Sequence, residues 1–128
     1  MQSAQARLSL IPAYGDPAIG SVALQSVFGK CRAFLRLRGV AVATPMFSGE
    51  AEMAAGGYAG EFIVPLAQAT EPPVETILEA WFEGRSGRAV RLTVGEMEAV
   101  ARSTPEAEAF LRRARQLRET RFAYDENG

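Results

Sequence analysis

Four glutamates recur at every fourth position in one stretch of the sequence and form its most regular group of ionisable side chains: Glu71, Glu75, Glu79 and Glu83. Residues spaced by four are neighbours on a helix, where like charges repel by roughly a few tenths of a kcal/mol. The pattern indicates a solvated helix face, or glutamates paired with Arg85 and Arg88, or else an acidic ridge that docks a basic partner. Acid–base catalysis would need burial in a cleft to raise one carboxyl pKa, and an exposed face does not provide it.

Nucleophilic side chains are few. The sequence has no histidine, which excludes Ser-His and Cys-His pairs. Ser26 precedes Lys30 by four residues, but a Ser-Lys pair would require that lysine to be desolvated. Cys31 is the only cysteine and falls on an apolar stripe, so we expect it to pack as a small hydrophobe. We therefore expect a protein without catalytic residues, cofactor or metal ligands. A histidine-free enzyme that uses Cys31 or carboxylates is kept as a third hypothesis.

Basic side chains gather near the end of the sequence, at Arg112, Arg113, Arg115, Arg118 and Arg121. On a helix they lie in the C-terminal half, where cations complement the helix dipole. Glutamates at 106, 108 and 119 offset them, and the net charge of the chain is −1. We therefore interpret the cluster as a solvated face and do not expect nucleic acid as a partner.

The length of 128 residues is that of one domain, and 48% hydrophobic residues make a packed core possible. We expect a single domain over residues 1–128, with frayed ends at 1–5 and 123–128. No apolar run is long enough to span a membrane, and the first residues do not read as a signal peptide. We expect a cytoplasmic protein with no membrane partner.

Periodicity places the elements of the first half. Residues 7–11 alternate as a strand and stop at Pro12. A helix follows to about Arg38, beginning either at Pro17 behind an Asp16 N-cap or later. Residues 40–44 and 61–66 are predicted as strands. The glycine-rich segment 48–60 between them is predicted as a mobile loop.

The second half is more regular. Prolines 72 and 73 open a helix whose apolar stripe is Val74, Ile77, Leu78, Trp81 and Phe82. Residues 88–102 form a hairpin around Gly95-Glu96, with three apolar pairs on one face: Val94 with Met97, Leu92 with Ala99, and Val90 with Ala101. Thr104-Pro105 caps the last helix. The predicted fold is α+β, in the order β-α-β-β-α-β-β-α: an open sheet of about five strands with three helices mainly on one face.

The second half resembles the effector-associated constant component domains of bacterial conflict systems. The similarity covers about residues 60–120 and rests on a strand at 62–66, an Ala80-Trp81 pair in a helix, a valine- and arginine-rich strand at 87–94, a short turn, and a final helix from Glu106 to Glu119. It implies a bacterial, non-catalytic module that recruits or docks other components. The family supplies no catalytic residues to carry over.

Two hypotheses of function rank before that of a histidine-free enzyme. The first is a protein-interaction or adaptor module, acting on a protein partner or self-associating as a homo-oligomer through an exposed sheet edge. Its candidate contact residues are Trp81, Phe82, Glu75, Glu79, Glu83 and Arg85. The alternative is a small-molecule binding protein with an apolar pocket between sheet and helices. The candidate pocket residues are Phe28, Phe34, Met53, Tyr58 and Phe62.

Overall fold

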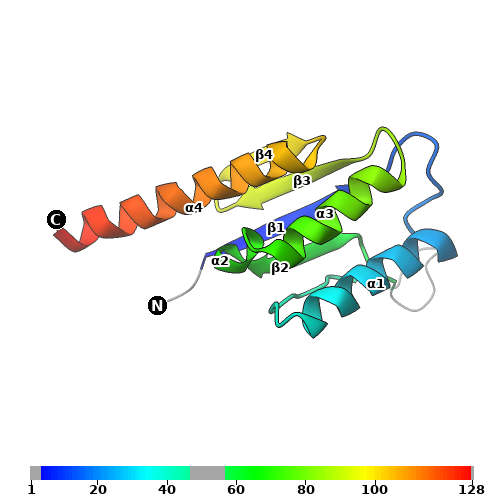
Figure 1. Ribbon diagram of the computed structural model, residues 1–128, viewed down its shortest axis with the longest axis horizontal. Coiled ribbons are helices and arrows are strands. Elements are labelled where there is room, and N and C mark those ends of the chain that lie inside the picture. The colour runs from blue at the N-terminus through cyan, green and yellow to red at the C-terminus, as the bar shows by residue number, and fades with distance from the viewer. Residues whose placement is uncertain (1–3, 47–56, 128) are drawn as a thin grey trace.

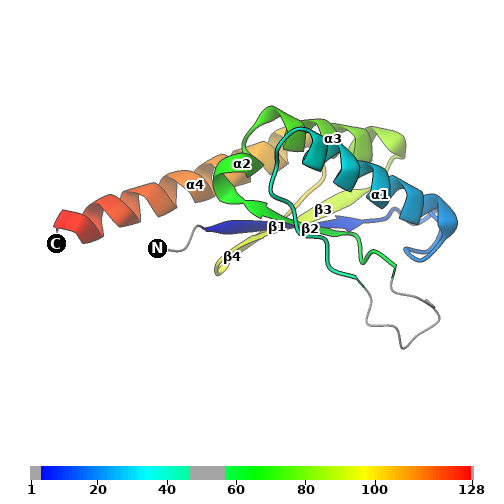
Figure 2. The same ribbon diagram turned by 90° about the horizontal axis from the view of Figure 1, so that it is seen from below.

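A computed structural model describes residues 4–46 and 57–127, with side chains described as far as residue 119. It contains a four-stranded antiparallel sheet in the order β2-β1-β3-β4. The strands are β1 (Gln5–Ile11), β2 (Glu61–Pro65), β3 (Ala89–Val94) and β4 (Met97–Ala101). Figure 2 shows the helices together on one face of the sheet. The α+β class and the one-sided arrangement of helices are therefore confirmed.

The helices are α1 (Val22–Leu37), α2 (Leu66–Ala69), α3 (Pro72–Gly84) and α4 (Thr104–Asn127). The first begins at Val22 because Ser21 is its N-cap, with the Ser21 hydroxyl accepting from the Leu24 amide at 3.2 Å. The start at Pro17 is wrong. Gly39, at a φ of +83°, ends the helix as predicted. The short α2 was not predicted, because four residues are too few to show a helical period.

The core lies between the sheet and the helices. Along β1, Ala6, Leu8 and Leu10 point to the helices and alternate with more exposed residues, as the sequence predicted. The β3–β4 hairpin has the predicted register, with all three apolar pairs in place. Its turn needs a positive φ at Gly95, which is +60°.

The predicted strand at 40–44 is wrong. This segment makes one isolated bridge, in which the Ala43 and Ile63 amides and carbonyls bond to each other. The Gln68 side chain bonds to two more backbone groups. Its Oε1 accepts from the Ala41 amide at 2.9 Å, and its Nε2 donates to the Gly39 carbonyl. The sheet therefore has four strands. The 40–44 segment lies beside the outer edge of β2 and makes this one bridge to it.

The last helix is longer than expected and extends past the end of the sheet (Figure 1). Ala114 is the last buried residue among the side chains described on α4, and the helix continues from there to Asn127. No described helix is long and apolar enough to cross a lipid bilayer.

Candidate interaction surface

The aromatic pair of α3 does not form a surface anchor. Trp81 is 2% exposed, and its indole nitrogen donates to the Ala89 carbonyl at 3.0 Å. The Phe28 ring lies 6.2 Å away, centroid to centroid. Phe82, the next residue, is half-buried against the core. The geometry places Trp81 in the core, so a partner cannot reach it without unfolding.

An unpredicted ion cluster lies beside Trp81. The carboxylate of Asp16 accepts from Arg88 through Nε and Nη2, both at 3.0 Å, and from the Ala13 amide at 2.7 Å. Arg85 adds a second cation, with its Nε 3.1 Å from the Asp16 carboxylate. The Asp16 side chain is 1% exposed, and the hydrogen bond from Arg88 holds its pKa below the ordinary value. The Arg88 guanidinium stacks on the Trp81 ring at 4.0 Å.

This cluster is a tertiary contact in which both carboxylate oxygens of Asp16 accept from arginine. It ties the loop before α1 to the loop between α3 and β3, two segments far apart in the sequence. The cluster also excludes the predicted pairing of Arg85 and Arg88 with the glutamates of α3, because both arginines bind Asp16 instead. The sequence around Asp16 does not predict this cluster. The Asp16-Pro17 pair is typical of a helix N-cap, but the structure has the N-cap of α1 at Ser21.

The glutamates of α3 do form an exposed row, of which Glu79 and Glu83 are the most open. Glu75 is half-buried and lies beside Glu108 of α4. Burial raises the pKa of Glu108 above its ordinary value, and the neighbouring carboxyl group of Glu75 and the charge of Glu79 raise it further. Among the described residues, no group of three or more acidic, cysteine or histidine side chains is placed to hold a metal ion.

The described residues among the pocket candidates belong to the core or pack against it. Phe28 and Phe62 are fully buried in the core, and Phe34 and Tyr58 pack against it. Gln25 holds Tyr58 by its backbone, through bonds of 2.7 Å and 2.8 Å. Met53 lies outside the described residues.

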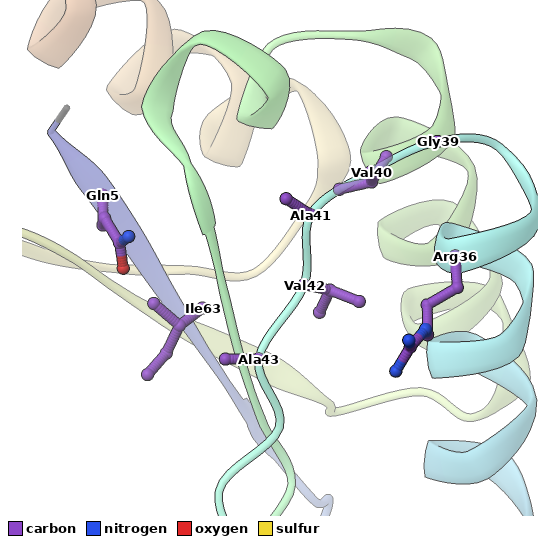
Figure 3. Close-up of a pocket in the computed structure, with 8 residues that line it drawn as sticks. All are labelled: Gln5, Arg36, Gly39, Val40, Ala41, Val42, Ala43 and Ile63. Atoms are coloured by element: carbon purple, nitrogen blue, oxygen red, sulfur yellow. The ribbon is translucent and has the colours of Figure 1, made fainter.

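A surface hollow does exist elsewhere, with a volume of about 510 Å³. It lies where the 39–43 segment passes between the end of α1 and the β1–β2 edge (Figure 3). Its lining is mostly backbone and small side chains, with Arg36 and Gln5 as the polar groups. A hollow of this kind has few directed contacts for a ligand.

Neither candidate nucleophile is activated. Ser26 and Lys30 are both exposed, so the lysine is not desolvated. Cys31 is half-buried against the core, and burial raises the pKa of its thiol to about 11.

We expect Cys31 to be alkylated by iodoacetamide at pH 7 about 100-fold more slowly than an exposed thiol, because only the thiolate reacts and its fraction falls tenfold per pKa unit. The rate should still be rising at pH 10. Mass spectrometry of quenched samples measures it, with a Ser26→Cys variant as the exposed reference. Equal rates at the two positions would show that Cys31 is an accessible, reactive thiol.

The open edge of the sheet is β4. In a hairpin with a two-residue turn, the residues beside the turn bond to each other and bonding then alternates along the strand. Met97, Ala99 and Ala101 therefore bond to β3, and the amides and carbonyls of Glu98 and Val100 point outward. No strand lies beyond β4 among the described residues. This edge carries no proline and no lysine, the usual protections against strand addition.

Exposed apolar side chains border this edge on both faces. Val100, on the face away from the helices, is 45% exposed. On the other face α4 packs on β3 and β4. Positions two apart lie about 200° apart around a helix. Glu108 and Arg115 contact Glu75 and Thr70 on the α3 side, so Phe110 and Leu117 lie on the flank toward the β4 edge.

We call this region the β4–α4 surface: the outward backbone of Glu98 and Val100, the Val100 side chain, and the α4 flank formed by Glu106, Phe110, Arg113 and Leu117. Leu117 is 45% exposed, Phe110 is half-buried, and Glu106 and Arg113 are exposed. The sequence predicts an exposed strand edge but singles out none of these residues. They are identified by the register of the hairpin and by the length of α4.

Comparisons with protein-family models, curated proteins and solved structures return no match to this chain. The resemblance to the effector-associated constant component domains therefore rests on its residue pattern alone.

Proposed function

We propose that this chain is a non-catalytic protein-interaction module that docks through the β4–α4 surface. The observation that carries the proposal is the open β4 edge, whose outward backbone groups lie between exposed apolar side chains, Val100 on one face and Leu117 on the other. Strand addition uses this combination: the edge supplies directed hydrogen bonds and the flanking side chains supply apolar contact. The resemblance to a docking family supports the same class of function.

The exposed flank of α4 supports the proposal independently. Leu117 is an apolar side chain that is 45% exposed on the side of the helix toward β4. A partner lying against β4 would also lie beside this flank and would remove the Leu117 side chain from water, which is favourable.

A photo-crosslinking test addresses the proposal in the cell that encodes the chain. A benzophenone amino acid is placed at Val100, with the same probe at exposed Ser26 on α1 as the matched control. We expect protein adducts at position 100 and none of comparable yield at 26. If position 100 yields no protein adduct on irradiation, or the same adducts as position 26, the proposed function is wrong.

The alternative, a small-molecule binding protein, is supported by the hollow beside the 39–43 segment. Its test is a thermal-shift screen with small anions and metabolite mixtures, because a ligand that binds only the folded state raises the melting temperature. A shift that an Arg36→Ala variant abolishes would favour this function over docking.

A further inference from the structure

We propose that the partner at the β4–α4 surface is a second copy of this chain, with β4 paired antiparallel to its own copy across a two-fold axis near Ala99. This inference rests on the proposed function and names its occupant. It joins two four-stranded sheets into one continuous sheet, with the two α4 helices side by side on the same face.

In this register the backbone of β4 can pair with β4 of a second copy. The outward groups belong to Glu98 and Val100, so an axis at Ala99 sets Glu98 of one copy opposite Val100 of the other. Each such pair can exchange both of its backbone hydrogen bonds. No carboxylate then faces a carboxylate, and Glu98 already has its cation in Arg91, at 3.1 Å. At the axis Ala99 meets Ala99, and so small a side chain does not hinder close approach.

The position of α4 fits the same pairing. Adjacent strands lie about 4.8 Å apart. Because α4 packs on both β3 and β4, its axis lies about half a strand spacing inside β4, which sets the two helix axes about 10 Å apart across the new strand pair. This is an ordinary helix-packing distance, so strand pairing and helix contact are compatible.

In this arrangement the charges on the α4 flank are complementary to those on the α4 flank of the second copy. The helix begins at Thr104, beside the end of β4, and the Arg118 side chain reaches Gly95 in the β3–β4 turn. With a rise of about 1.5 Å per helical residue against about 3.4 Å per strand residue, Ala99 lies level with about residue 109 of α4, next to Phe110. An antiparallel copy then brings Phe110 against Phe110, with Glu106 of each copy beside Arg113 of the other.

These matches favour a second copy over an unrelated protein. A strand edge can pair with many sequences. Opposite charges at matching distances on either side of a two-fold axis are paired when the partner is a second copy of this chain. Glu106 also accepts from the Arg102 amide at 2.7 Å, which fixes its carboxylate near the end of β4.

Sedimentation of the full chain over a wide concentration range tests the proposal. We expect conversion from the mass of one chain to that of two. An Arg113→Glu variant, which sets two carboxylates side by side, should weaken dimerisation by at least about tenfold. The control is Arg36→Glu, an exposed arginine on α1 with the same charge change, which should dimerise as the native chain does.

Disulfide trapping tests the register. In a Cys31→Ser background, Ala99→Cys should cross-link two copies on mild oxidation, because facing residues of a non-bonded antiparallel pair lie about 4.5–5.5 Å apart between their β-carbons. Ser26→Cys should not. A native chain that stays monomeric at every concentration overturns the proposal, as does equal cross-linking at both positions. If the probe at Val100 nevertheless captures another protein, only the second-copy inference fails and the docking function stands.

Discussion

Replacing Trp81 by alanine should lower the free energy of unfolding by about 3–5 kcal/mol, the range for removing a large buried aromatic side chain. Trp81 fills the space between α1, α3 and β3, where it contacts Phe28 and Arg88 and bonds to the Ala89 carbonyl. The substitution removes its apolar surface, leaves a cavity and frees a buried carbonyl. Urea denaturation followed by circular dichroism measures the loss.

Phe82→Ala is the matched control, because it removes an aromatic side chain from the next position on the same helix, where the side chain is only half-buried. We expect it to cost about 1–2 kcal/mol, since less apolar surface returns to water. If Trp81→Ala costs no more than Phe82→Ala, the core packing described for Trp81 is wrong.

Replacing Asp16 by asparagine should cost about 3 kcal/mol at pH 7, because it removes the negative charge that neutralises the nearly buried guanidinium of Arg88. An amide keeps the shape of the side chain but cannot accept both guanidinium bonds. Glu61→Gln is the control, since the Arg7–Glu61 pair is exposed and such pairs contribute about 0–1 kcal/mol. Equal costs for the two variants would show that burial does not strengthen the Asp16 cluster.

The contribution of Asp16 should depend on pH. The pKa of its carboxyl lies below the ordinary value of 3.8 in the folded chain, so folding favours the ionised form. The stabilisation is therefore fully present above pH 3.8 and is lost as the pH falls from there through the folded pKa. The stability difference between the native chain and Asp16→Asn should shrink in that acid range and stay constant between pH 5 and 7.

Local patterns predicted the second half of the fold well. The α3 stripe, its proline start and the hairpin register each follow from short-range spacing, and in the hairpin the turn chemistry and the apolar pairs agree on a single register. The first half depends on long-range contacts. Residues 40–44 have strand-like composition, yet the side chain of Gln68 in α2 bonds to the Ala41 amide and the Gly39 carbonyl in place of a neighbouring strand.

The candidate site was harder to predict because it consists of what the fold leaves uncovered. Trp81 and Phe82 are the largest apolar pair in the sequence, and their size does not reveal whether they face the core. The exposure of Leu117 depends on where the sheet ends under α4. Asp16 illustrates the same limit, since its partners Arg85 and Arg88 lie in a loop that only the tertiary fold brings near.

The isolated bridge between Ala43 and Ile63 has a consequence for the size of any assembly. A protein with two equally accessible sheet edges can add copies at both and grow into a fibre. Here the chain's own 40–44 segment lies along part of the β2 edge, so an assembly formed by the proposed pairing at β4 should stop at two copies. A variant in which Ala43 can no longer make that bridge should lose this limit and polymerise.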